Sequence, residues 1–193
     1  MLTLSVNKAN LIEVKLQQIE QREIRPYYMD YKKFIRFGKN GKGDISLLLE
    51  DAGALKQAAA EMLAPFQRNK IDKVAAIEAR GFLFGVLIAG DSRLPLVLVR
   101  KGGNLPLEVL REEVIDYTGR KKVLEIQKDA IRKGERVLLV DDWLETGAQI
   151  RGALRMIEKL GGEIAGITVL VDSAVPNAKD FLSNYLYHYL IHI

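Results

Sequence analysis

The sequence predicts an α/β fold with a central, mostly parallel sheet flanked by helices. Short apolar runs of strand length recur at 73–77, 96–99, 137–140 and 164–171, and helical patterns separate most of them. Strands that alternate with helices are typical of parallel sheets with both faces covered. At 193 residues, with 48% hydrophobic and 28% charged residues, the chain is expected to form a single domain with a substantial core.

The N-terminal part is expected to contain two helices around an aromatic and basic segment. Residues 8–22 carry apolar positions at roughly helical spacing. The segment 27–49 reads as a strand, a turn and then a strand or loop, because glycines gather at 38–43. Asp51 is a candidate N-cap for the alanine-rich helix expected over 51–68.

The rest of the chain supplies the remaining helices and strands. Helices are expected to start at Phe82–Ala89 and to run over Ile150–Leu160. Residues 100–122 are polar and contain several Gly and Pro residues, so we expect a long mobile loop there. Val123–Lys128 should form a strand, and residues 184–193 read as a final strand.

The composition disfavours several classes of protein and site. The chain has no cysteine, which excludes disulfides, thiolate metal sites and cysteine nucleophiles. Both histidines lie in the last six residues, which disfavours a histidine-based metal site or triad. No signal-peptide pattern or membrane-length apolar run is present, so we expect a cytoplasmic protein without a membrane partner. The net charge of +4 fits an anionic substrate and gives little support for nucleic-acid binding.

The most informative segment is VLLVDDWLETGAQ at 137–149. An apolar strand leads to the adjacent carboxylates of Asp141 and Asp142, and a turn at Thr146 and Gly147 opens a helix. Exposed amides at such a turn suit a phosphate, and carboxylates suit hydroxyls or a hydrated divalent cation. Helix capping is the structural alternative for the carboxylates, but only one of two neighbours can cap the same helix. The segment therefore predicts a site for a sugar phosphate.

Two more charged segments are expected at the same edge of the sheet. Glu78–Gly81 follows one strand, and Arg100 with Lys101 follows the next. Ligands of parallel sheets bind beyond the carboxyl ends of the strands. Arg80, Arg100 and Lys101 should therefore approach the acidic pair, as a metal-bound polyphosphate with an attached sugar would require. Taken singly, each of these groups is more often a solvated charge than a ligand.

Together these motifs resemble the type I phosphoribosyltransferases, and especially the adenine phosphoribosyltransferases. The segment at 137–149 is similar to that family's phosphoribosyl pyrophosphate signature. Three more segments agree in order and spacing: IEARGFLFG at 77–85, VLVRKGGNLP at 97–106 and LEIQKDAIRKGERVLLVDD at 124–142. The resemblance covers roughly residues 43–173.

The resemblance implies a type I phosphoribosyltransferase fold in one domain, 1–193. Residues 1–50 and 174–193 would form a hood, residues 70–173 the core, and residues 101–120 a flexible lid. The lid would close over bound substrates and exclude water.

The resemblance also implies a role for each motif. Asp141 and Asp142 would hold the ribose hydroxyls and help to position Mg²⁺. The 5′-phosphate would be bound by backbone amides and the Thr146 hydroxyl within the segment Glu145, Thr146, Gly147, Ala148 and Gln149. The pyrophosphate would be bound by Ala79, Arg80, Gly81, Arg100 and Lys101. Arg80 would also act in catalysis by neutralising charge on the leaving group.

Three candidate residues depart from the pattern of the adenine enzymes. Glu145 replaces an alanine, and enzymes of the same fold that use hypoxanthine, guanine or xanthine carry an acid there that reaches the purine imidazole nitrogen. We therefore take Glu145 as a catalytic candidate, with a helix-dipole role as the alternative. Trp143 replaces an aliphatic residue near the base and is a candidate base contact, with core packing as the alternative. Asp116 is a catalytic candidate in the lid, where the adenine enzymes show a Glu-Tyr-Gly core.

Other departures affect the phosphate loop and the base end. Ala148 and Gln149 replace the usual Gly and Thr or Ser, which removes one hydroxyl donor. Gly43 replaces the Arg of the adenine-contacting segment.

The activity implied is transfer of the 5-phosphoribosyl group from phosphoribosyl pyrophosphate to adenine or a related purine, by a Mg²⁺-dependent homodimer. The products would be a nucleoside 5′-monophosphate and pyrophosphate. Displacement at the anomeric carbon needs positioning, metal-assisted departure and exclusion of water more than a covalent nucleophile. Two alternatives stay open: a regulator that senses the activated sugar without turnover, and a phosphoribosyltransferase for a non-purine base.

Overall fold

The computed structural model describes residues 29–39, 41–103, 105–115 and 119–193. The helix expected over 8–22 and the candidate Asp116 lie outside these ranges.

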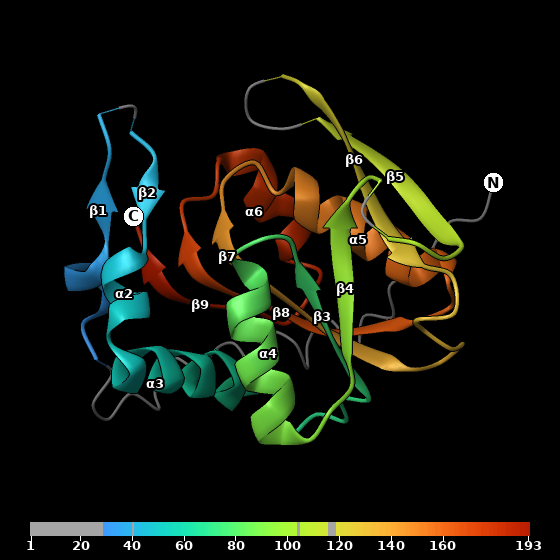
Figure 1. The fold of residues 1–193 in the computed structure, drawn as a ribbon, viewed down its shortest axis with the longest axis horizontal. Coiled ribbons are helices and arrows are strands. Elements are labelled where there is room, and N and C mark those ends of the chain that lie inside the picture. The colour runs from blue at the N-terminus through green and yellow to red at the C-terminus, as the bar shows by residue number, and fades with distance from the viewer. Residues whose placement is uncertain (1–28, 40, 104, 116–118) are drawn as a thin grey trace.

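A seven-stranded sheet forms the centre of the molecule (Figure 1). Its strands are β3 (Lys73–Ile77), β4 (Leu96–Lys101), β5 (Val109–Ile115), β6 (Lys121–Gln127), β7 (Arg136–Leu144), β8 (Glu163–Asp172) and β9 (Tyr187–His192). Their order is β5-β6-β4-β3-β7-β8-β9. Five neighbouring strands of this order run parallel: β4, β3, β7, β8 and β9. Strand β6 pairs antiparallel with both β4 and β5. The predicted mostly parallel α/β fold is therefore confirmed.

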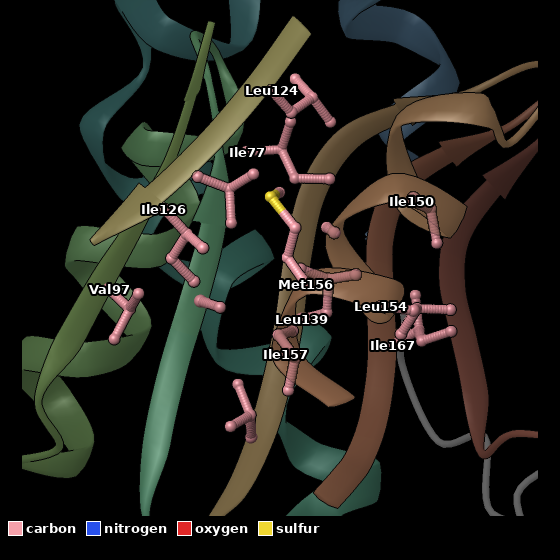
Figure 2. Close-up of a cluster of buried hydrophobic side chains, with 14 of the residues drawn as sticks. Ile77, Val97, Leu124, Ile126, Leu139, Ile150, Leu154, Met156, Ile157 and Ile167 are labelled. Carbon is pink, nitrogen blue, oxygen red and sulfur yellow. The ribbon is translucent and has the colours of Figure 1, made fainter. Parts of the chain in front are cut away.

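Helices cover both faces of the sheet (Figure 1). They are α2 (Ser46–Glu50), α3 (Ala52–Leu63), α4 (Gly81–Ser92), α5 (Ala148–Lys159) and α6 (Pro176–Leu182). Side chains of α3 and α4 share one buried cluster with the sheet, and side chains of α5 and α6 share the other. Figure 2 shows the second cluster, in which Met156 and Ile157 of α5 pack near Leu139 of β7.

The central strands are buried on both faces. The first five residues of β7 after Arg136 are all buried, as are the last eight of β8. Parallel strands between two helical layers carry continuous apolar runs for this reason. The strongest apolar runs of the sequence therefore mark the middle of the sheet, where the ligand-binding edge of an open α/β fold lies.

A small hairpin stands beside the sheet next to the C-terminal strand (Figure 1). It consists of β1 (Arg36–Phe37) and β2 (Gly43–Asp44), and Phe37 lies opposite Gly43. The strand, turn and strand or loop expected over 27–49 are confirmed only as these two very short strands, because Tyr31–Phe34 forms a 3-10 helix and Ser46–Glu50 forms α2. The Asp51 side chain accepts a hydrogen bond of 2.9 Å from the Ala54 N–H, so the predicted cap of α3 is confirmed.

Residues 100–122 differ from the long loop that the sequence suggests. Seven of them form β5, which pairs with β6 along its whole length. The reason is packing against α5: Val114 lies against Gly152, and the Glu112 carboxylate pairs with Arg155 and Lys159, each at 2.6 Å. Mobility of the predicted lid stays a prediction, but β5, which lies within the lid segment 101–120, is anchored to α5.

The strand that carries the acidic pair is longer than predicted, and a further helix, α6, was not foreseen. Strand β7 runs to Leu144 instead of ending at Val140. It continues because its far end pairs with β8, with Asp141 opposite Val169 and Trp143 opposite Val171.

Within the described ranges, no helix has the length and apolar character that crossing a membrane requires.

Candidate functional site

A cavity of about 360 Å³ lies at the carboxyl ends of β3 and β7. It brings together segments that are far apart in the sequence: the β1–β2 hairpin, the loop after β3, and the turn between β7 and α5. Its lining residues are Lys42, Gly43, Glu78, Arg80, Asp141, Asp142, Trp143, Leu144, Glu145, Thr146, Gly147, Ala148, Gln149 and Ile150. The predicted edge of the sheet therefore holds a real hollow, and it contains most of the predicted site residues.

The acidic pair lies inside β7 near its carboxyl end. Both Asp141 and Asp142 are buried, and the Asp142 N–H donates a 2.9 Å hydrogen bond to Oδ1 of Asp141. Helix α4 approaches so closely that a Cβ on Gly81 would lie 2.9 Å from that same oxygen. The backbone thus fixes Asp141 tightly, and only glycine fits at the start of α4.

Arg80 lies between the acidic pair and the hairpin. Its Nε is 2.7 Å from Oδ2 of Asp142, and its Nη1 donates a 3.2 Å hydrogen bond to the Gly43 carbonyl. The Asp142 oxygen is buried and has an ion pair with Arg80 but no aligned hydrogen bond within the described part of the chain. A buried carboxylate oxygen without a hydrogen-bond donor is costly, so this oxygen favours a ligand that donates one.

Burial shapes the protonation of the pair. Burial, and next the charge of Asp142, raise the pKa of the Asp141 carboxyl well above its ordinary value of 3.8. Burial also raises the pKa of Asp142, and the Arg80 guanidinium opposes that rise. Two adjacent carboxylates resist ionising together in a low dielectric. The pair is therefore adapted to a cationic or hydrogen-bond-donating partner.

The turn between β7 and α5 lines the cavity with Glu145, Thr146, Gly147, Ala148 and Gln149. Gly147 has φ of +71°, which favours glycine, and a Cβ there would also lie 2.7 Å from the Phe181 ring. The Thr146 hydroxyl accepts a long hydrogen bond of 3.4 Å from the Ala148 N–H. Helix α5 starts at this turn, and the first amides of a helix attract anions.

Arg100 and Lys101 lie at the end of β4 and are absent from the lining of the cavity. Glu78 holds them: its Oε2 accepts hydrogen bonds from Arg100 Nε at 3.1 Å and from the Lys101 amide at 3.0 Å. Although burial opposes it, these two donors keep the pKa of Glu78 below its ordinary value. Ala79 follows Glu78 in the loop that leads to Arg80.

Sequence reasoning missed how Trp143 packs against the hairpin at one end of the cavity. The Trp143 indole lies against Gly43, and its Nε1 donates a 2.9 Å hydrogen bond to the Ser173 hydroxyl. It also missed Phe181, whose ring centroid lies 4.3 Å from Cζ of Arg151 beside the turn at Gly147. The glycine at position 43 is visible in the sequence, but its contact with Trp143, 100 residues further along the chain, appears only in the structure.

Comparisons with known proteins show the family and the fold. The family described as phosphoribosyl transferase domain matches residues 48–187. An adenine phosphoribosyltransferase of Clostridium novyi is 38% identical over 163 residues, which are 81% of this chain and 94% of that protein. One of Dinoroseobacter shibae is 41% identical over 129 residues, 67% of this chain and 72% of that protein. The crystal structure of adenine phosphoribosyltransferase from Thermoanaerobacter pseudethanolicus has a TM-score of 0.78 and 35% identity, and covers 85% of this chain and 98% of that one.

The burial of the acidic pair is expected to lower the free energy of unfolding near neutral pH. Since the folded-state pKa of Asp141 lies above 3.8, the free energy of unfolding falls as pH rises through that folded pKa. Asp141→Asn keeps the oxygen that accepts the Asp142 N–H and removes the charge. We expect this variant to be more stable than the wild type at pH 7, because it no longer buries a charged carboxylate beside Asp142.

Urea unfolding between pH 4 and pH 8 measures this effect. The gain of Asp141→Asn should shrink as pH falls toward 4, because the buried wild-type carboxyl is then protonated and uncharged in the folded state. Asp129→Asn, at an exposed turn, is the matched control and should show no such gain. A D141N variant that is less stable at pH 7, or whose gain is the same at every pH, would contradict the interpretation.

Proposed function

The chain belongs to the type I phosphoribosyltransferases, and from this premise we propose that it transfers the 5-phosphoribosyl group of phosphoribosyl pyrophosphate to a purine base. The products are a nucleoside 5′-monophosphate and pyrophosphate. The bond from the anomeric carbon to a ring nitrogen of the base forms as the bond to the pyrophosphate oxygen breaks. The electron pair leaves with pyrophosphate, and the base gives up a proton.

One observation carries this proposal: the buried acidic pair and the turn at Gly147, where α5 begins, line the same cavity. A 5′-phosphate at the start of α5 would place the ribose of the same molecule over β7. Its hydroxyls can then donate to Asp141 and Asp142, including the Asp142 oxygen that lacks an aligned donor. Phosphate and sugar are thus recognised by groups of the right polarity at adjoining positions.

The same acidic pair fits Mg²⁺ that arrives with the substrate. Among the described residues, no group of three or more His, Cys, Asp or Glu side chains is placed to hold a metal ion. Mg²⁺ commonly uses one or two carboxylates and takes its other oxygens from substrate phosphates and water. We propose that Asp141 and Asp142 supply the protein's share. When bound, the ion would neutralise charge on the departing pyrophosphate.

The remaining work falls to positioning and charge. Arg80 lies at the wall of the cavity next to Asp142, from where it can turn to the leaving pyrophosphate and offer a guanidinium to its oxygens. Arg100 and Lys101 stand behind the same loop on Glu78 and add positive charge on that side. We propose that Ala79 and Gly81 shape this loop and that the 101–120 segment completes the enclosure.

We propose adenine as the base. The curated relatives and the solved structure named above are adenine phosphoribosyltransferases, and the chain covers most of their length. With the phosphate at the α5 end and the ribose over β7, the base lies at the end lined by Trp143 and the hairpin.

Release of pyrophosphate, measured over a panel of bases, tests the proposed function. We expect turnover with adenine, and we expect Asp142→Asn to lower kcat/KM at least about 100-fold, as removal of a group that stabilises transition-state charge does. Glu50→Gln, at the exposed end of α2, is the control. A protein that binds phosphoribosyl pyrophosphate but releases no pyrophosphate with any base would be a sensor and would contradict the proposal, as would turnover with pyrimidines alone.

Glu145 is proposed to take the proton that the base gives up. It directly follows β7, lines the cavity and is half-buried. The position lies between the phosphate turn and Trp143, so the carboxylate can reach the imidazole edge of a purine whose ribose lies over the acidic pair.

For Glu145→Gln we expect kcat to fall by about 100-fold, within the usual range for general bases, with the KM for phosphoribosyl pyrophosphate little changed. The pH profile of kcat should lose its acidic limb. Glu158→Gln, on the exposed side of α5, is the matched control. If Glu145→Gln keeps the wild-type kcat and pH profile, Glu145 has only a structural role.

We also propose a homodimer that forms through α4. The helix sequence GFLFGVLIAG is apolar on every side, as in helices that are buried all round. Yet Leu83 is 40% and Val86 57% exposed, and Leu98 of the neighbouring β4 is 37% exposed. Figure 1 shows α4 in front of the sheet. A second copy of the chain is the partner that would cover this patch.

Light scattering after gel filtration tests this proposal. We expect twice the mass of one 21.7 kDa chain, and we expect Val86→Glu to give a single chain, because a buried unpaired charge is costly. Leu107→Glu, at a residue that is also exposed but lies in the segment before β5, should remain a dimer. A wild-type monomer at micromolar concentration would rule the dimer out.

A further inference from the structure

The hairpin and the floor of the cavity fit together through one glycine. Gly43 of β2 lies against the indole of Trp143, and a Cβ at position 43 would overlap the ring atoms Cη2 and Cζ3. Gly43 is not among the described glycines with positive φ, so its backbone would accept any residue. The requirement for glycine is therefore space, and the large side chain of Trp143 creates it.

The indole is held by a hydrogen bond and by a ring contact. Its Nε1 donates to the Ser173 hydroxyl at 2.9 Å, and that hydroxyl donates to the Leu144 carbonyl at 2.9 Å. The Phe37 ring meets it edge to face, with centroids 6.3 Å apart and an interplanar angle of 86°. Since rotation would break the hydrogen bond and enter the hairpin, the ring has a fixed place on the wall of the cavity.

The hairpin is held against the same wall by its backbone. The Gly43 carbonyl accepts a hydrogen bond from Arg80, which pairs with Asp142. Phe37, opposite Gly43 in the hairpin, contacts the indole as well. Position 43 thus touches both the group proposed to bind pyrophosphate and the ring proposed to meet the base.

We propose that Gly43 and Trp143 form an interlock that sets the width of the base-binding end, which makes Gly43 a specificity-determining residue. This inference rests on the proposed function for its ligand. The indole N–H is already used by Ser173, so the ring offers the base an apolar surface and no hydrogen bond. It selects a flat heteroaromatic ring by stacking. Any side chain at position 43 pushes the indole toward the space of the base.

The single tryptophan makes the interlock directly observable. Trp143 is the only Trp in the chain, so fluorescence excited at the long-wavelength edge, where tyrosine does not absorb, reports this ring alone. In the wild type we expect adenine to quench the emission in the presence of phosphoribosyl pyrophosphate. In ligand-free Gly43→Ala we expect a shifted emission maximum, because the displaced indole gains exposure to water.

Kinetics of a double-mutant cycle test the pairing. We expect Trp143→Leu to raise the KM for adenine about tenfold, in line with base–aromatic stacking, with the KM for phosphoribosyl pyrophosphate changed less than about twofold. Gly43→Ala should give a similar rise. The double variant should be no worse than Trp143→Leu, because the overlapping atoms are gone. Additive effects, near 100-fold, would overturn the interlock.

Controls separate the possible failures. Gly53→Ala, where the added Cβ meets only an ordinary contact of 3.4 Å, should leave emission and both KM values unchanged. If Trp143→Leu does not fold, Trp143→Phe lacks the overlapping atoms and replaces it in the cycle. An active wild type whose Gly43→Ala variant keeps the wild-type emission and KM for adenine contradicts the interlock alone. A wild type without turnover contradicts the proposed function, and an unshifted emission in ligand-free Gly43→Ala still overturns the interlock.

Discussion

The site depends on the burial of two adjacent carboxylates at the end of the central strand β7. Asp141 and Asp142 alternate to opposite sides of the strand, yet both are held away from water by the elements packed around them. Burial raises the pKa of each, which costs stability in the absence of a partner. Two neighbouring residues are adapted to the buried pair. Gly81 permits the close approach of α4 to Asp141, and Arg80 supplies a positive charge beside Asp142.

Much of the fold could be predicted from the sequence, because its central strands bury both faces and carry continuous apolar runs. The strands at 73–77 and 164–171 are examples, and the Asp51 cap of α3 has its own local signal. Strand β5 could not be read in this way. Its polar residues are ordered by partners far along the chain, such as Arg155 and Lys159 for Glu112, and such pairs leave no periodic pattern.

The candidate site shows the same division. The acidic pair and the Thr-Gly turn form a contiguous motif whose chemistry is readable without a structure, and the structure places both on one cavity. The proposed base end is assembled from the hairpin, β7 and the segment after β8, so the contact of Gly43 with Trp143 appears only in three dimensions. The departures at positions 43 and 143 are therefore linked: the glycine of β2 leaves the space that the large indole of β7 fills.

A crystal structure with bound adenosine 5′-monophosphate tests the central claim most directly. We expect the 5′-phosphate against the amides of residues 146–149, the ribose hydroxyls on the carboxylates of Asp141 and Asp142, and the purine on the Trp143 face. A nucleotide bound elsewhere, or one whose phosphate lies at the Arg80 loop with the ribose away from β7, would contradict the account.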